Sequence, residues 1–319
     1  MSGALPVSTF TLPLPVVAFL LKPYFRLAFN SRLPYRIQRL LLEAGAPLQQ
    51  VPAGAVVRPL ELACRPAEKI TVGATERPTA VLYLHGGAYT LGSLATHRSL
   101  AAHLARESSS AVFTLDYRLA PENPYPAALD DAVSAFMQLV TEFDYSEDRV
   151  AIAGDSAGGG LAAATALRLI ERHGVTPGAL ALISPWVDPG DRGATKKADL
   201  VVNTAWSFDA ADAYLAGGDR TDPGYAPMHG KLDGLPPTRI HVGSEEVLYP
   251  QIMTFTDKLA AAGVDVSLVE YARLWHVAHA QASLVKEAAD AVADLGHFIA
   301  SKLIRAKDDS SSAVGSSAH

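Results

Sequence analysis

Short apolar runs alternate with stretches of helical periodicity along most of the chain. Apolar or β-branched runs of strand length are expected at 56–62, 70–72, 80–85, 111–116, 149–153, 180–183, 238–242 and 266–271. Apolar positions recurring near every 3.6 residues predict helices at 97–107, 127–141, 161–172, 251–262 and 283–303. Apolar strands that alternate with helices are typical of a mostly parallel sheet covered on both faces. The expected fold class is therefore α/β.

Residues 186–235 interrupt this alternation, because the segment is too long for a simple connection between a strand and a helix. We interpret it as an inserted cap segment with helical pieces near 198–204 and 209–216. A basic helical stretch at 24–42 predicts that the N-terminal part of the chain forms the other half of this cap. The expected division is 1–55 for the N-terminal part of the cap, 56–185 and 236–305 for the core, 186–235 for the insertion, and a disordered Ser-rich tail at 306–319.

Composition and charge narrow the function classes. With 319 residues, 49% hydrophobic and 19% charged, the chain has globular composition. Its single cysteine, Cys64, excludes an internal disulfide and multi-cysteine metal sites, and fits a reducing compartment. The net charge of −6 argues against nucleic acid as a partner. Residues 1–60 carry six basic side chains against one acidic one, a net of +5, so the rest of the chain carries −11.

The first 21 residues are uncharged but match neither a signal peptide nor a membrane span. A positive n-region is missing, and Pro6, Pro13 and Pro15 interrupt the apolar run. The longest proline-free apolar stretch, 16–21, is far shorter than the ~20 residues that a bilayer requires. A peripheral contact of this basic, apolar segment with a membrane stays open as an alternative to a role in the cap.

The sequence Gly154-Asp155-Ser156-Ala157-Gly158 joins a predicted buried strand to a predicted helix. This G-x-S-x-G pattern in a strand–turn–helix context predicts a nucleophilic Ser156, raised above the sheet at a helix N-terminus. The glycine-rich alternative, a phosphate-binding loop, requires spacings that this segment lacks. The segment Gly86-Gly87-Ala88 follows another buried strand, and we assign the amides of Gly86, Gly87 and Ala157 to an oxyanion hole.

A general base is expected in the loop after the last strand, where His276 lies, with His279 as its rival. An acid that orients the base is expected after the preceding strand, where Glu245 and Glu246 are both candidates. The resulting order along the chain is serine, acid, histidine, which is the order of α/β-hydrolases.

With these motifs in this order, the sequence resembles the hormone-sensitive-lipase-like carboxylesterases, the HGG and GDSAG branch of the α/β-hydrolase fold. The resemblance rests on LHGGAY (84–89), DYRLAPENPYPAALDDA (116–132), AGDSAGGGLA (153–162), SPWVD (184–188), GLPPT (234–238), VGSEEVL (242–248) and LWHV (274–277). It covers about 56–303 in the correct order. It implies Ser156 as nucleophile, His276 as base and Glu246 as acid, with Ala88 in place of the third glycine of the family's HGGG.

The resemblance implies a serine carboxylesterase for small to medium acyl esters that uses no metal or cofactor. Lactone hydrolysis, deacetylation or amide hydrolysis by the same triad, a membrane-associated lipase, and a non-catalytic receptor are the alternatives. We expect a small-molecule ester substrate, no nucleic acid, a cytoplasmic protein with a peripheral membrane contact as a variant, and leave a homodimer open. The aromatic side chains expected in the pocket are Tyr89, Trp186, Trp206, Phe208, Tyr214 and Trp275.

Overall fold

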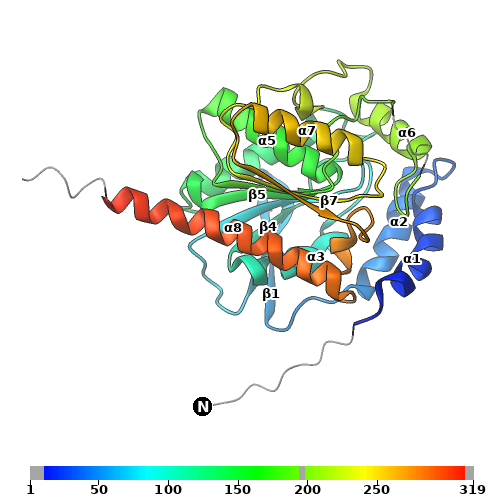
Figure 1. The fold of residues 1–319 in the computed structure, drawn as a ribbon, viewed down its shortest axis with the longest axis horizontal. Helices are drawn as coiled ribbons and strands as arrows, with labels where there is room; N and C mark the ends of the chain where they lie inside the picture. The colour runs from blue at the N-terminus through cyan, green and yellow to red at the C-terminus, as the bar shows by residue number, and fades with distance from the viewer. Residues whose placement is uncertain (1–10, 194–197, 313–319) are drawn as a thin grey trace, which may run out of the picture.

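The computed structural model describes residues 11–193 and 198–312, without the side chains of 304–312. Within these residues eight strands form one sheet in the order β1-β2-β4-β3-β5-β6-β7-β8 (Figure 1). The β1–β2 and β2–β4 pairs are antiparallel and the later pairs are parallel, which confirms the predicted mostly parallel sheet. The strands are β1 (Ala55–Leu62), β2 (Arg65–Val72), β3 (Ala80–Leu84), β4 (Ala111–Leu115), β5 (Val150–Asp155), β6 (Ala179–Ile183), β7 (Thr238–Gly243) and β8 (Val266–Tyr271).

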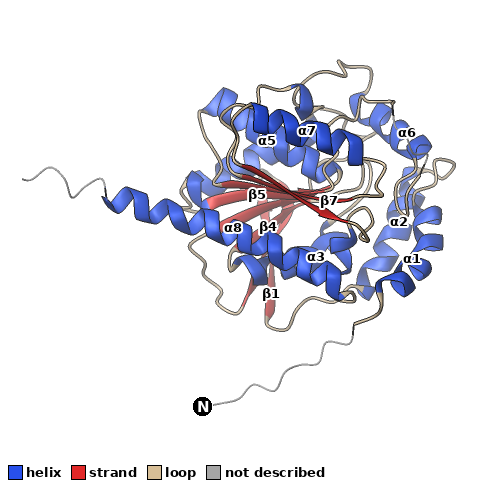
Figure 2. Ribbon diagram, viewed as in Figure 1, coloured by secondary structure: helices blue, strands red, loops and turns tan. Residues whose placement is uncertain are grey.

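Helices cover both faces of this sheet, as Figure 2 shows. Successive side chains of a strand point to opposite faces, so Val81 and Tyr83 of β3 pack with α3 and α8, whereas Leu82 and Leu84 pack with α4, α5 and α7. Both faces of the central strands are therefore buried, which explains why their sequences are apolar without alternation. These helices are α3 (Leu94–Ser108), α4 (Ala127–Thr141), α5 (Ala157–His173), α7 (Tyr249–Ala261) and α8 (Lys286–Ser312).

Three further helices lie together at one end of the molecule (Figure 1): α1 (Leu14–Ala28), α2 (Tyr35–Gly45) and α6 (Thr204–Leu215). Trp206 Nε1 on α6 donates a hydrogen bond of 2.8 Å to Gln38 Oε1 on α2. Asn203 Nδ2 donates to the carbonyl oxygen of Phe29 over 2.9 Å, and the Phe29 and Trp206 rings lie 4.6 Å apart. The N-terminal segment and the insertion therefore pack against each other.

Arg39 fastens α2 to the core. Its Nε donates to the carbonyl oxygen of Thr90 over 2.8 Å, and its Nη2 donates to that of Ala120 over 2.9 Å. The guanidinium also pairs with Glu122 at 2.8 Å. Because Thr90 closely follows β3, these contacts place α2 beside the loop predicted to hold the oxyanion.

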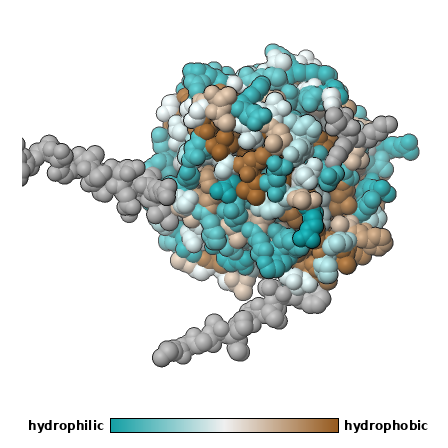
Figure 3. Space-filling model, in the orientation of Figure 1, coloured by the Kyte–Doolittle hydropathy of each residue, from teal (hydrophilic) through white to brown (hydrophobic). Residues whose placement is uncertain are grey.

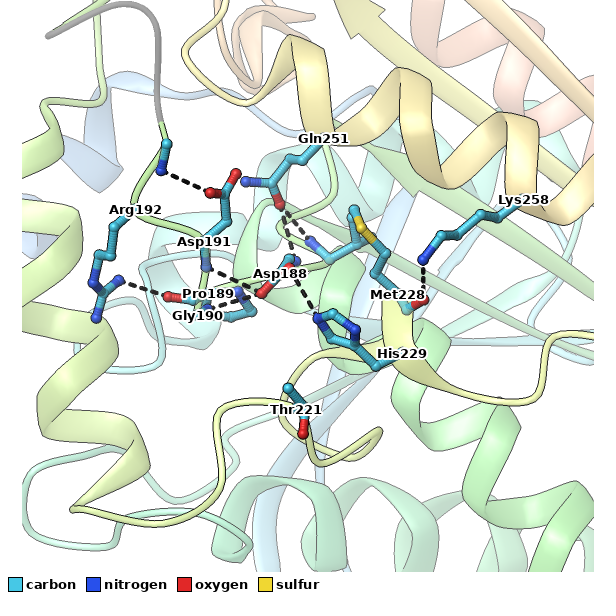
Figure 4. A network of polar contacts seen from close by, with 12 residues as sticks. Asp188, Pro189, Gly190, Asp191, Arg192, Thr221, Met228, His229, Gln251 and Lys258 are labelled. Atoms are coloured by element: carbon cyan, nitrogen blue, oxygen red, sulfur yellow. Dashed lines mark hydrogen bonds and ion pairs between the residues drawn. The ribbon is translucent and has the colours of Figure 1, made fainter.

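The two ends of the insertion are tied to α7, as Figure 4 shows. Gln251 Oε1 accepts hydrogen bonds from two successive amides where the insertion begins, the second that of Asp188. Asp188 Oδ2 lies 3.0 Å from Nε2 of His229, near the other end of the insertion. Lys258 donates to the carbonyl oxygen of the residue before His229 over 3.2 Å. The insertion therefore starts and ends at one fixed point of the core.

Two local predictions were wrong. The helix predicted at 198–204 does not form before its last residue: Ala198 and Asn203 form an isolated antiparallel bridge, and the Asn203 side chain accepts from the Trp206 amide, so α6 begins at Thr204. The predicted disorder from 306 is contradicted as far as Ser312, because α8 continues to that residue. Extending an existing helix avoids the cost of nucleation, which favours this continuation. Residues 313–319 lie outside the described part.

Pro13 and Pro15 start a helix rather than interrupt one, while Pro23 lies inside that helix and Pro6 lies outside the described residues. Pro13 is the N-cap of α1, and Pro15 lies in its first turn, where a missing amide hydrogen costs no helical hydrogen bond. None of the helices in the described part of the chain has the length and hydropathy of a membrane span. Apolar side chains nevertheless gather on the outer side of α1, at the lower right of Figure 3.

Candidate active site

Ser156 occupies the sharp turn between β5 and α5. Its φ of 52° and ψ of −120° are a strained conformation for a residue with a Cβ, and its amide donates to the carbonyl oxygen of Ile183 over 2.8 Å. A Cβ on Gly158 would collide with the carbonyl oxygen of Leu84, so the turn packs this closely against β3 only with glycine there. The local sequence thus holds the serine at the carboxyl end of the central strand.

His276 lies between Ser156 and Glu246. Its Nε2 is 2.9 Å from Ser156 Oγ, and its Nδ1 is 2.8 Å from Glu246 Oε2. Both the ring and the carboxylate are buried. The histidine follows β8 and the glutamate follows β7, so the adjacent carboxyl ends of these parallel strands bring the two together. Glu245, the other candidate acid, is exposed.

Two hydrogen bonds fix the other oxygen of Glu246. The amide of Gly243 donates to Oε1 over 2.6 Å, and the hydroxyl of Ser184 donates to it over 2.8 Å. Ser184 in turn accepts from the amide of Val277, next to His276, at 3.4 Å. Sequence reasoning gave Ser184 no role, although it stands in the SPWVD segment. Its place at the end of β6 was the only signal that could have indicated one.

Burial of the His276 ring lowers its pKa, but the hydrogen bond from Nδ1 to Glu246 and the charge of that carboxylate outweigh burial. The pKa of His276 therefore lies above its ordinary value. A neutral ring that gains basicity from a buried carboxylate is suited to accept a proton from a hydroxyl group.

The rival base His279 and a second buried histidine, His85, are engaged elsewhere. His85 Nδ1 lies 2.8 Å from the carbonyl oxygen of Gly86, and burial together with the neighbouring His97 lowers the pKa of His85 to about 3. His279 Nε2 lies 3.0 Å from Nδ1 of His241, and burial holds the pKa of His279 well below its usual range. Both rings are thus held neutral within structural contacts.

One of the oxyanion donors predicted in the loop after β3 was wrong. The amide of Gly86 donates to Asp155 Oδ1 over 3.1 Å, so it is not available to a substrate. The amides of Gly87, Ala88 and Ala157 have no hydrogen-bond acceptor within the described residues. Gly87 and Ala88 have φ values of 121° and 52°, and this turn exposes their amides at the cavity.

The buried carboxylate of Asp155 engages the Gly86 amide as part of a larger set of contacts. Besides the Gly86 amide, its carboxylate accepts from the Tyr83 hydroxyl over 2.6 Å and lies 3.4 Å from His97 Nε2. Burial raises the pKa of Asp155, but the charge and hydrogen bond of His97 and the Tyr83 hydroxyl outweigh it. The pKa therefore lies below its ordinary value, and the ionised carboxylate braces the loop.

A cavity of about 510 Å³ opens onto Ser156, His276, Gly87 and Ala88. Its walls come largely from the cap and are mainly apolar, with Val17, Leu21, Tyr24, Phe25, Phe29 and Leu42 among them. The N-terminal apolar residues thus face the cavity, as predicted for the cap role. Among the described residues, no group of three His, Cys, Asp or Glu side chains is arranged to hold a metal ion.

Of the aromatic side chains predicted for the pocket, Trp206 lines this cavity. The prediction was wrong for Tyr89 and Tyr214, because their rings stack on each other inside the core, with ring centres 3.8 Å apart. Trp186 is buried beside them, with its ring 6.3 Å from that of Tyr89. These rings therefore pack against one another in the core and do not line the cavity.

The pocket prediction was also wrong for Phe208 and Trp275, which do not line the cavity. The guanidinium of Arg192 lies 4.6 Å from the centre of the Phe208 ring, a cation–π contact on the far side of α6 from the cavity lining. Trp275 precedes His276 but packs in a cluster with Leu14 and Val17 of α1. Proximity in sequence to the base did not bring its ring to the cavity.

Comparison with known proteins places this site in a family context. The α/β hydrolase fold family matches residues 81–280. An acetyl-hydrolase of Streptomyces hygroscopicus is 39% identical over 247 residues, which are 73% of this chain and 82% of that protein. An esterase of Acinetobacter venetianus is 34% identical over 250 residues, 77% of this chain and 82% of that protein.

Solved structures give the same picture. An esterase from the bacterial hormone-sensitive lipase family superimposes with a TM-score of 0.84 at 32% identity, covering 90% of this chain and 98% of the other. A hormone-sensitive lipase from a metagenome library gives a TM-score of 0.86 at 34% identity, covering 92% and 99%. The structural similarity therefore extends over about nine-tenths of the chain.

Proposed function

Because the chain belongs to the α/β hydrolase family and is an esterase, we propose that it cleaves carboxylic esters through an acyl-enzyme formed on Ser156. The observation that carries this proposal is the contact of His276 with Ser156 Oγ on one side and with Glu246 on the other, at 2.9 and 2.8 Å. This is the geometry that a nucleophile, a base and an orienting acid require.

In the first half of the reaction, Ser156 Oγ bonds to the ester carbonyl carbon while its proton passes to His276 Nε2. Glu246 stabilises the imidazolium through Nδ1. The tetrahedral intermediate then collapses, the bond to the alcohol oxygen breaks, and His276 donates its proton to that leaving alcohol. In the second half, water adds to the acyl-enzyme with the same proton transfers, which releases the acid and restores Ser156.

The developing oxyanion would be stabilised by the amides of Gly87, Ala88 and Ala157, which lack acceptors among the described residues. One such donor contributes ~3 kcal/mol to lowering the barrier. Ala157 is the first residue of α5, so the positive end of the helix dipole lies at the same place.

The cavity favours an uncharged substrate. Its walls from α1, α2 and α6 are mainly apolar, and it extends well beyond the volume of an acetyl group. The acetyl-hydrolase name of one relative favours a short acyl group, with the larger alcohol part in the cavity. Acetylated hydrophobic alcohols are therefore the substrate class that we favour over long-chain acyl esters.

Replacing Ser156 by alanine tests the nucleophile. We expect the variant to lose at least 99.9% of the hydrolysis of p-nitrophenyl acetate, because loss of a catalytic serine costs about 10⁶-fold in kcat, with an unchanged circular dichroism spectrum. It should also no longer be labelled by a fluorophosphonate probe. A variant that keeps a tenth of the rate would remove Ser156 from the mechanism.

A panel of p-nitrophenyl esters from acetyl to palmitoyl, with lactones and aryl amides added, separates the substrate classes. Highest kcat/KM on acetyl esters would support the proposal. Higher values on a lactone or an amide would assign the same site to those substrates instead.

A further inference from the structure

The N-terminal part of the cap carries a set of exposed apolar side chains. Every large hydrophobic side chain that is exposed within the described residues lies between positions 16 and 51. Phe19 is 77% exposed, Leu48 72%, Leu40 63% and Leu20 60%. We call the exposed apolar side chains of α1, α2 and the segment up to Val51 the apolar cap surface. Exposure of this extent at one place indicates a binding surface.

Helix α1 has two apolar stripes. Leu14, Val17 and Ala28 are buried, whereas Val16, Phe19, Leu20 and Leu27 are exposed and form a second stripe on the opposite side of the helix. A helix that only covered a core would present polar residues on this outer side. The second stripe therefore lacks the partner that its composition calls for.

Basic side chains surround this surface. Lys22, Arg26 and Arg32 are exposed, and none of them contacts a carboxylate in the part of the chain that the structure describes. Glu43 is the sole acidic residue among positions 1–60, whereas the rest of the chain is strongly acidic. The apolar cap surface thus belongs to the basic segment of an otherwise acidic chain, and it complements a partner that is both apolar and anionic.

The cavity reaches this surface. Leu20 and Leu48 belong to the exposed set and also line the cavity that contains Ser156. An apolar molecule could therefore pass from a partner seated on the apolar cap surface to the candidate nucleophile without crossing water.

We propose that the apolar cap surface docks onto an anionic lipid surface, with the cavity mouth turned toward the lipid. α1 would lie in the plane of the headgroups, with its outer stripe buried and its basic side chains at the phosphates. A second copy of the chain fits less well, because a two-fold interface would place the basic side chains of the two copies opposite one another. Delivery of substrate from the lipid rests on the proposed function, whereas docking itself does not.

Co-sedimentation with vesicles tests docking. The Ser156→Ala protein is mixed at low salt with vesicles of phosphatidylcholine alone or with about 30% phosphatidylglycerol. We expect partition onto the anionic vesicles that falls at least tenfold when salt is raised to about 0.5 M. Equal partition onto neutral vesicles, or none onto either, overturns the proposal.

Two variants and one control locate the contact. Phe19→Ser/Leu40→Ser and Arg26→Gln/Arg32→Gln should each lower the partition coefficient at least tenfold, since roughly fivefold per surface cation is expected. Arg58→Gln/Arg172→Gln removes the same charge from exposed positions outside the cap and should partition like the parent. If the control falls as far as the cap variants, the contact is non-specific and the proposal fails.

Two readouts separate the remaining outcomes. With Ser156 restored, the Phe19→Ser/Leu40→Ser variant should hydrolyse soluble p-nitrophenyl acetate at the parent rate but lose activity on an ester carried in anionic vesicles. Sedimentation velocity shows whether the parent is a dimer that this variant dissociates. A dimer of that kind without vesicle binding would assign the apolar cap surface to a second copy and overturn lipid docking.

Discussion

Glu246→Gln isolates the orienting role of the carboxylate. Gly243 and Ser184 both donate to Oε1, so the oxygen of the new amide must occupy that position. The amide nitrogen then replaces Oε2, 2.8 Å from His276 Nδ1. Two N–H groups cannot face each other, so the ring must carry its proton on Nε2 and point it at Ser156 Oγ. In this tautomer the ring cannot accept the serine proton.

The size of the effect follows from that tautomer. A carboxylate-to-amide change at the equivalent position of serine protease triads lowers kcat about 10⁴-fold, which corresponds to roughly 5 kcal/mol of barrier. We expect a loss of this order on p-nitrophenyl acetate, with little change in the thermal midpoint because shape and volume are kept. The assay is kcat/KM with the concentration of active sites measured independently.

Glu245→Gln is the matched control, because it makes the same change one residue away at an exposed position. We expect it to keep at least half of the parent activity, as usual for a surface substitution. The reasoning is refuted if Glu246→Gln keeps a tenth of the activity, or if the Glu245 variant is the damaged one. The first result would mean that His276 does not need the carboxylate, and the second that Glu246 is not the acid.

Three further predictions concern the same site and its cap. First, kcat/KM should fall toward acid pH with an apparent pKa above the ordinary 6.5 of histidine, because the base works only when neutral and the pKa of His276 is raised; a pH–rate profile with its acid limb at or below that value would contradict this. Second, Ser184→Ala removes one of the two donors to Glu246 Oε1. It should lower kcat about tenfold with KM unchanged, because a hydrogen bond to a charged group contributes ~1.5 kcal/mol. A change in KM alone would assign Ser184 to substrate binding. Third, Gln38→Leu leaves the buried Trp206 Nε1 without its acceptor, which costs about 1–3 kcal/mol. The thermal midpoint should therefore fall by a few degrees, while the rate on p-nitrophenyl acetate stays within about twofold. An unchanged midpoint would show that this hydrogen bond does not hold α2 and α6 together.

The core was predictable because a parallel sheet covered on both faces leaves an unambiguous pattern. β3, β4 and β6 are buried at every position, and their sequences are correspondingly apolar throughout. The positions of Ser156, Glu246 and His276 were predictable for a related reason. Each follows the carboxyl end of a parallel strand, and such ends meet at one edge of the sheet whatever the intervening sequence.

The oxyanion loop was not predictable in the same detail. Whether Gly86 or Ala88 presents a free amide depends on the Asp155 side chain, which reaches across from β5 to accept from Gly86. No pattern within the glycine-rich segment carries that information, since it arises from a contact between two strand ends. The pocket prediction for the aromatic residues was wrong for the same reason. Composition indicates that Tyr89 and Tyr214 are large and apolar, but not that they stack on each other.

The N-terminal segment shows how a correct observation can support two structures. Its prolines argued against an inserted helix, yet Pro13 and Pro15 stand at the start of α1, where helices accept proline. Once α1 forms, a helix this apolar must either be surrounded or leave one side uncovered. Contacts with α2, α6 and the segment around Trp275 cover one side only. The outer stripe of α1 remains exposed beside the basic residues, so the charge asymmetry of the chain and the opening of its cavity meet at one surface.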